Sequence, residues 1–139
     1  MDVSIQIESN FLERPNATVN GKVEKIEGKH FISWIQLPQK DEAFGSKYKL
    51  QFDPEVGVLD LERTGDCVTR MRFRKGTRSR GELTTQEGQF ELEIYTHQLQ
   101  VFAEPGVAYL SYDLIFGGQE PMHNELKINI VPVEAQKRE

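Results

Sequence analysis

The stretch that decides the fold is residues 107–131, VAYLSYDLIFGGQEPMHNELKINIV. Apolar and polar residues alternate through 107–116 and again through 122–131, a period that is typical of β-strands with one buried face. Between them, residues 117–121 carry the glycines and the proline that favour a turn. The stretch therefore predicts an antiparallel hairpin with one apolar and one polar face.

The register of this hairpin can be inferred from its pattern, because a shift by one residue would turn every side chain to the other face. Pairing Phe116 with Met122 places nearly all apolar side chains together. Two polar groups remain on the apolar face, the Tyr112 hydroxyl and the Asn124 amide, and we expect both to point into the core. The opposite face is predicted to hold Ser111, Asp113, Glu125, Lys127 and Asn129.

The same alternation continues along most of the chain. Turn-forming segments separate the runs at intervals of about 8–12 residues, and residues 38–45 form a polar loop with room for one helical turn. The predicted strands before the hairpin are 3–11, 18–24, 31–37, 47–52, 58–63, 68–74, 77–85, 90–96 and 99–102. About eight to ten strands in up-and-down order predict an all-β fold, a single antiparallel meander closed into a barrel without exposed edges.

Length and composition bound the class of protein. A chain of 139 residues fits one domain, here 1–139 with its core at about 2–132 and a polar tail at 134–139. A hydrophobic content of 37% excludes a disordered chain. The net charge of −5 argues against a protein that binds nucleic acid or membrane surfaces through overall positive charge.

Targeting signals and disulfides are not predicted. The first residues, MDVSIQIES, lack the basic and apolar regions of a signal peptide, and no apolar run reaches the length of a membrane span. Cys67 is the single cysteine, so no intrachain disulfide forms. We therefore expect a cytoplasmic protein without a membrane segment.

The strongest local charge feature is a basic run with no acidic residue between Asp66 and Glu82. It contains Arg70, Arg72, Arg74, Lys75, Arg78 and Arg80. A three-residue connection at 75–77 would turn these arginines outward, beside Asp60, Glu62, Glu82, Glu91 and Glu93 on the same or neighbouring strands. We favour this outer ladder of neutralised charges.

Two alternatives remain open for the basic run. A two-residue connection at 75–76 would turn Arg78 and Arg80 into the barrel, where a guanidinium needs an anionic partner such as a ligand carboxylate or phosphate. The outward-facing run could instead bind RNA or an acidic protein partner, although Tyr95 is the main aromatic residue nearby for stacking a base.

Other candidate chemistry is sparse. His30, His97 and His123 have no partners at the sequence spacing of a metal site, so we predict no metal and no cofactor. Asp113 and His123 could form a dyad near Ser111, but no nucleophile elbow is present and catalysis is not the favoured interpretation.

Short motifs in this order resemble the YwiB-like family of small bacterial proteins. They are Arg72-Phe73 with Gly76, Gly88 before Phe90-Glu91-Leu92-Glu93, Ser111-Tyr112-Asp113, and His123-Asn124. The resemblance covers nearly the whole chain. It implies a calycin-type, lipocalin-like antiparallel barrel in a bacterial cytoplasm, and it supplies no catalytic residues.

The functional hypothesis from the sequence is a barrel that binds a small apolar or anionic molecule in its interior. The candidate ligand-binding residues are Tyr112, Asn124, Arg72, Arg80 and Trp34. Trp34 is more often a core residue than part of a ligand cage in such a strand. A structural or interaction module without a ligand is a further alternative. The sequence does not distinguish a monomer from a homodimer.

Overall fold

The protein is described here by a computed structural model that covers residues 1–9, 16–37, 45–102, 104–117 and 119–132. The ordered elements of these residues are all β-strands. They are β1 (Asp2–Ser9), β2 (Asn16–Ile26), β3 (Lys29–Gln36), β4 (Ser46–Asp53), β5 (Val58–Thr64), β6 (Val68–Phe73), β7 (Arg78–Thr85), β8 (Gly88–Val101), β9 (Val107–Ile115) and β10 (Met122–Pro132).

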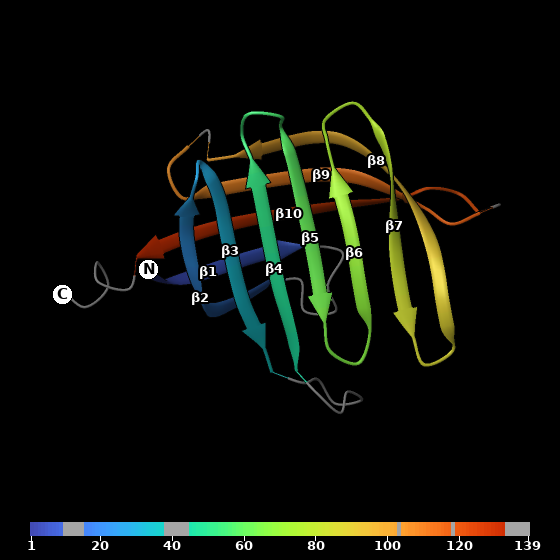
Figure 1. Cartoon of the computed structure of the whole chain (residues 1–139), viewed down its shortest axis with the longest axis horizontal. Coiled ribbons are helices and arrows are strands. Elements are labelled where there is room, and N and C mark those ends of the chain that lie inside the picture. Colours follow the sequence, from blue (N-terminus) through green and yellow to red (C-terminus); the bar gives the residue numbers. More distant parts are fainter. Residues whose placement is uncertain (10–15, 38–44, 103, 118, 133–139) are drawn as a thin grey trace.

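The ten strands form one closed antiparallel barrel in which each strand pairs with its neighbours in the sequence. β1 closes the barrel because it pairs with both β2 and β10. In Figure 1, β2 to β7 run side by side across the front, and β1, β10 and β9 cross behind them. The long strand β8 curves from the front layer to the back layer (Figure 1). The predicted single up-and-down barrel is therefore confirmed. Within the described ranges, no helix is long and apolar enough to cross a membrane.

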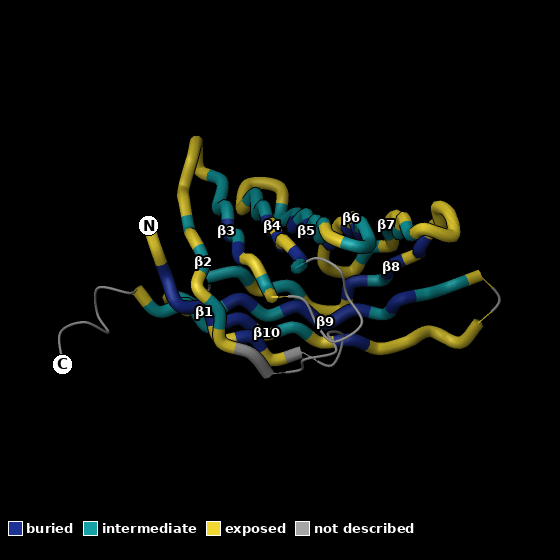
Figure 2. Tube along the Cα trace, turned by 90° about the horizontal axis from the view of Figure 1, so that it is seen from below, coloured by how far each residue is buried: buried dark blue, intermediate teal, exposed yellow. Residues whose placement is uncertain are grey.

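The core lies between these two layers, and the strands present buried residues in alternation (Figure 2). Inward side chains from nearly every strand fill it, among them Ile5, Trp34, Leu50, Phe73 and Ile94. A void lined by apolar residues of β3, β4, β5, β8, β9 and β10 has a volume of only about 10 Å³. That is about the space of a single water molecule, so side chains fill this part of the barrel.

The hairpin of β9 and β10 has the predicted faces but a different register. Met122 pairs with Leu114, and Asn124 pairs with Tyr112, so the predicted pairing of Phe116 with Met122 is wrong by two residues. The connection is longer than predicted, since β9 already ends at Ile115. A shift of two residues leaves every side chain on its face, because the side-chain period of a strand is two.

The strands predicted at 90–96 and 99–102 are one strand, β8, because a β-bulge between Thr96 and Gln98 bends the chain without ending the strand. Phe90, which its parity assigns to the core, is 45% exposed near the end of the β7–β8 hairpin. The helical turn expected in the loop and the polar tail fall on residues 38–44 and 133–139, outside the described residues.

Gly21 in β2 lies close to both neighbouring strands. A Cβ atom there would lie 2.5 Å from both Ile5 Cδ1 and the backbone oxygen of Ser33. We expect Gly21→Ala to lower the free energy of unfolding by about 1–3 kcal/mol, the usual cost of overpacking. Gly117→Ala is the matched control, since nothing lies within 4 Å of its added methyl group. Urea unfolding measures both, and equal stability of the two variants would contradict this account.

Candidate functional site

Polar side chains gather on the outer face of β8, β9 and β10. The alternation of β9 turns Tyr109, Ser111 and Asp113 outward, while Leu110, Tyr112 and Leu114 are buried in the barrel. On β10 the same alternation turns His123 and Glu125 outward, directly opposite Asp113 and Ser111. The pattern of two strands thus brings acidic, hydroxyl and imidazole groups to one surface.

His97 joins this surface through the bulge of β8. Tyr95 pairs with Asp113 and Thr96 with Tyr112, but the next pair is Gln98 with Ser111, so His97 is the extra residue. Thr96 is fully buried, and His97 is exposed. A bulge commonly redirects one side chain in this way, and here it places an imidazole beside β9.

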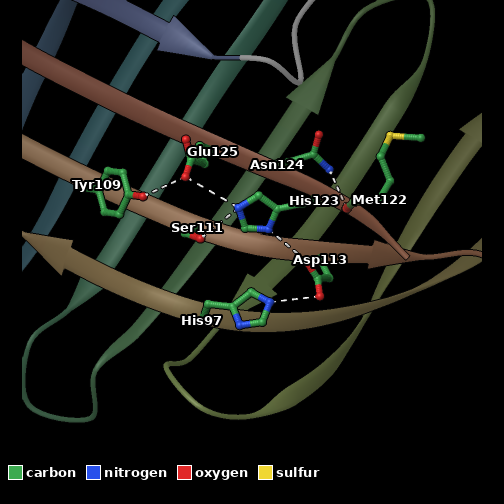
Figure 3. Close-up of polar contacts among 8 residues, drawn as sticks. All are labelled: His97, Tyr109, Ser111, Asp113, Met122, His123, Asn124 and Glu125. Atoms are coloured by element: carbon green, nitrogen blue, oxygen red, sulfur yellow. Dashed lines mark hydrogen bonds and ion pairs between the residues drawn. The ribbon is translucent and has the colours of Figure 1, made fainter. Parts of the chain in front are cut away.

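Asp113 is the centre of the cluster, because its two carboxylate oxygens contact two different imidazoles (Figure 3). His97 Nε2 lies 2.9 Å from Asp113 Oδ2, and His123 Nδ1 lies 2.9 Å from Asp113 Oδ1. The centroids of the two imidazole rings are 5.6 Å apart. The three side chains come from three adjacent strands, whose backbone pairing fixes their spacing.

The second ring nitrogen of His123, Nε2, also has polar contacts. Nε2 lies 3.4 Å from Ser111 Oγ and 3.5 Å from Glu125 Oε1. The Tyr109 hydroxyl in turn donates a hydrogen bond of 3.1 Å to Glu125 Oε1 (Figure 3). His123 is therefore oriented from both sides of its ring, between two carboxylates.

These contacts shift the pKa values of Asp113 and His123. Hydrogen bonds from His123 and His97 hold the pKa of Asp113 below its ordinary value. The hydrogen bond to Asp113, with a smaller contribution from Glu125, raises the pKa of His123 above its ordinary value in spite of some desolvation. The cluster thus favours a cation between its carboxylates.

The donor atoms of His97, Asp113 and His123 all lie within 4.8 Å of one another, close enough to be ligands of one metal ion. Two bonds of about 2.1 Å from a zinc-like ion to its ligands span at most about 4.2 Å, so the side chains would have to turn slightly for all three atoms to bind one ion. The sequence spacing of the histidines gives no sign of this grouping, because the three side chains come together across strands rather than along one.

Ser111, His123 and Asp113 also lie in the order of a nucleophile, a base and an orienting acid. However, Ser111 is 5% exposed, and His123 Nε2 divides its contact between Ser111 and Glu125. β9 is paired on both sides, so its backbone N–H groups point into the two ladders instead of forming an oxyanion hole. The arrangement suits ligation better than acyl transfer.

Three of the ligand-binding candidates from the sequence lie inside the barrel. Tyr112 and Asn124 are adjacent and buried, as expected, and burial raises the pKa of the Tyr112 phenol. Trp34 is buried and stacks on Tyr48 at 5.0 Å between ring centroids. Tyr112 packs against Phe73, so these rings are part of the packed core.

Arg72 and Arg80 lie on the outer face instead, apart from the other three. The predicted outer ladder is confirmed in its register, with Arg70 opposite Glu82 and Arg80 opposite Glu93. Arg72 pairs with Asp60 at 2.8 Å, whereas Arg80 is exposed and its opposite residue Glu93 pairs with Arg78. Both arginines line an open groove of about 870 Å³ that extends across β2 to β8.

Sequence reasoning missed one arginine that does face inward. The Cζ atom of Arg63 lies 5.7 Å from the centroid of the Tyr48 ring. The Nε and Nη2 atoms of Arg63 donate hydrogen bonds to Ser46 Oγ. Leu59 and Leu61 on the same strand are buried, and the alternation that places them in the core also turns Arg63 inward. This alternation was the available signal. His97 was missed because its place depends on the bulge, for which the sequence carries no clear sign.

The fold and this surface define a class: a closed ten-stranded antiparallel barrel of calycin type with a packed interior and a polar cluster outside. The model of a family described as a domain of unknown function, DUF1934, matches residues 3–128, so the chain belongs to this family. No curated protein matches the sequence.

A solved structure supports the same assignment. The chain is similar to the crystal structure of the ywiB protein from Bacillus subtilis, with a TM-score of 0.62 and 15% sequence identity. The similarity covers 94% of this chain and 88% of that one. At this identity the likeness shows the shared fold, and with the family match it confirms the resemblance to YwiB-like proteins.

The first prediction from the outer face of the barrel concerns the arginine ladder. Arg72 is 64% exposed in its side chain and bound to Asp60. We expect Arg72→Gln to lower the free energy of unfolding by no more than about 1 kcal/mol, because solvent screens an exposed ion pair. Urea unfolding at low and high salt measures this, and a loss several times larger would show that the ladder is a main support of the barrel.

The second prediction concerns pH. The pKa of His123 is raised in the folded protein, so its interaction stabilises the fold below the unfolded value of about 6.5 and is lost as pH rises through the folded value. The pKa of Asp113 is lowered, so its contribution is present above about 3.9 and is lost as pH falls through the folded value.

The interaction between Asp113 and His123 should therefore stabilise the folded, metal-free protein most in mildly acidic solution. We expect Asp113→Asn to remove this stabilisation, as measured by unfolding across pH. The same variant should lower the pKa of His123, as measured by NMR titration. His30, which lies outside the cluster beside Phe52 and Phe102, is the internal reference. An unchanged pKa of His123 in Asp113→Asn would contradict the assignment.

Proposed function

We propose that this protein binds a divalent transition-metal ion on the outer face of its barrel, through His97, Asp113 and His123. The observation that carries the proposal is the convergence of two imidazole nitrogens and a carboxylate from three adjacent strands, within 4.8 Å of one another. Imidazole and carboxylate ligands together suit zinc and its neighbours in the first transition row.

The surroundings of the cluster support the same conclusion. Metal-bound histidines usually donate their second N–H group to a carboxylate, which fixes the ring and strengthens the ligand. Glu125 lies beside Nε2 of His123, on the side of the ring away from Asp113, and Tyr109 holds Glu125 in place. With a proton on Nε2, the Nδ1 lone pair faces the Asp113 carboxylate, and a cation between these two atoms relieves their repulsion.

The location on the outer face replaces the interior as the proposed binding site. A small apolar or anionic ligand in the barrel would need a cavity, and ligand pockets are typically a few hundred cubic ångströms in volume. The apolar void between β3, β4, β5, β8, β9 and β10 has a volume of about 10 Å³. Binding in the interior therefore has less support than binding at the polar surface.

The direct test is calorimetric titration of the metal-free protein with Zn²⁺, together with the visible spectrum of the Co²⁺ form. We expect one ion to bind per chain, and we expect the visible spectrum to show that the bound Co²⁺ has a low coordination number. His97→Gln and His123→Gln should each weaken Zn²⁺ binding by more than about tenfold, since loss of a supporting carboxylate alone costs about 10- to 100-fold. Glu125→Gln should weaken binding by about tenfold for that reason.

His30→Gln is the matched control, because it removes an imidazole that lies outside the cluster and contacts Phe52 and Phe102. Circular dichroism and urea unfolding establish that each variant is folded. Zn²⁺ binding that is equally strong in His97→Gln, His123→Gln and His30→Gln would overturn the proposal, as would the absence of Zn²⁺ binding to the parent protein.

A further inference from the structure

We infer that the metal-loaded site binds a phosphate group, which the metal ion and the basic side chains of Arg74, Lys75 and Arg78 hold together. This inference rests on the proposed metal function and names the class of ligand for it. It starts from the position of the β6–β7 hairpin, which carries the three basic residues and lies directly beside the strand that supplies His97.

The turn of this hairpin is attached to the bulge of β8. The backbone N–H of Gly76 donates to the Thr96 carbonyl at 2.8 Å, and the Thr96 N–H donates to the Thr77 carbonyl at 3.1 Å. Thr96 immediately precedes His97 in the chain. The backbone that carries Arg74 and Lys75 is therefore fixed next to the backbone that carries one of the metal ligands.

Arg78 lies in line with the site on the same outer face. It pairs in register with Tyr95 on β8, and Tyr95 pairs with Asp113 on β9. The rings of Tyr95 and His97 meet edge to face, with 4.9 Å between their centroids. Tyr95 is therefore the one residue between Arg78 on β7 and the cluster of His97, Asp113 and His123. Adjacent strands are about 4.8 Å apart, which leaves Arg78 within side-chain reach of a ligand on the metal.

The charges near the site differ from those of the rest of the ladder. Arg70 and Arg72 are neutralised by Glu62 and Asp60. Arg74 and Lys75 are exposed and form no ion pair with any residue that the structure describes. Arg78 contacts Glu93 at a longer 3.4 Å and keeps 69% of its side chain exposed.

A bound metal ion makes the net charge of this surface positive. The three basic side chains balance the carboxylates of Asp113, Glu125 and Glu93 when both imidazoles are neutral, so a divalent ion leaves two positive charges in excess. Two histidines and one aspartate leave a coordination position of a zinc-like ion open. Because His97 and His123 are 41% and 51% exposed, that position faces solvent and admits a ligand.

A phosphate monoester matches these features better than a carboxylate. It carries nearly two negative charges and offers several oxygens, so one oxygen can bind the metal while others accept paired hydrogen bonds from a guanidinium. A carboxylate carries one charge and has only two oxygens to divide among the same groups. The excess of two charges therefore selects a phosphate.

The experiment titrates phenyl phosphate into the Zn²⁺-loaded and the metal-free protein by calorimetry, with benzoate as the carboxylate comparison. The test variant is Arg74→Gln/Lys75→Gln. The control is Lys49→Gln/Arg80→Gln, which removes the same charge from exposed residues that form no ion pair within the described chain and that line the groove across β2 to β8. Zn²⁺ affinity is measured for every variant.

We expect phenyl phosphate to bind the loaded protein in preference to both the metal-free protein and benzoate. Arg74→Gln/Lys75→Gln should weaken this binding about tenfold while Zn²⁺ affinity stays the same, and the control should leave both unchanged. Zn²⁺ binding without phenyl phosphate binding overturns this inference and leaves the metal proposal standing. Equal weakening by the two double variants, or equal binding of benzoate, also overturns it. Failure to bind Zn²⁺ overturns both.

Discussion

The closure of the barrel by β1 is the constraint on which the rest of the structure depends. β1 pairs with β2 through Ile5 and Val19 and with β10 through Ile5 and Ile130, so the first and last strands of the chain meet. Its inward residues Val3, Ile5 and Ile7 are almost completely buried. Without this strand, β2 and β10 would each expose an unpaired edge and the core would open to water. Every strand therefore has two neighbours, and the outer face becomes a continuous surface with fixed spacing between side chains.

That continuous surface explains why function is proposed on the outside of this barrel. Large rings such as Phe73, Tyr112 and Trp34 occupy the interior, and their packing stabilises the fold while leaving little space. On the outer face, by contrast, paired strands hold polar groups at regular intervals with no need for a deep cavity. A site built in this way gains its precision from backbone registers, since exposed side chains on loops would be held less firmly.

The bulge in β8 connects local geometry with chemistry. It keeps Thr96 and Leu99 on the inner side while directing both His97 and Gln98 outward, which regular alternation does not permit. The same residue, Thr96, receives the turn of the β6–β7 hairpin through two backbone hydrogen bonds. One irregularity thus positions an imidazole beside Asp113 and brings a basic turn to its border. Bulges near functional sites commonly have this role.

The sequence by itself determined the fold class and the face of most side chains, because alternation with a period of two records burial directly. It placed Tyr112 and Asn124 inside, paired Asp113 with His123, and turned Arg72 outward beside Asp60. Tertiary structure alone decided the register of β9 and β10, since pairings two residues apart bury the same faces. It also decided the contact of His97 with Asp113 and the packing of the interior. These depend on where the chain departs from regular pairing and on how side chains from opposite walls fill one volume, which no local pattern encodes.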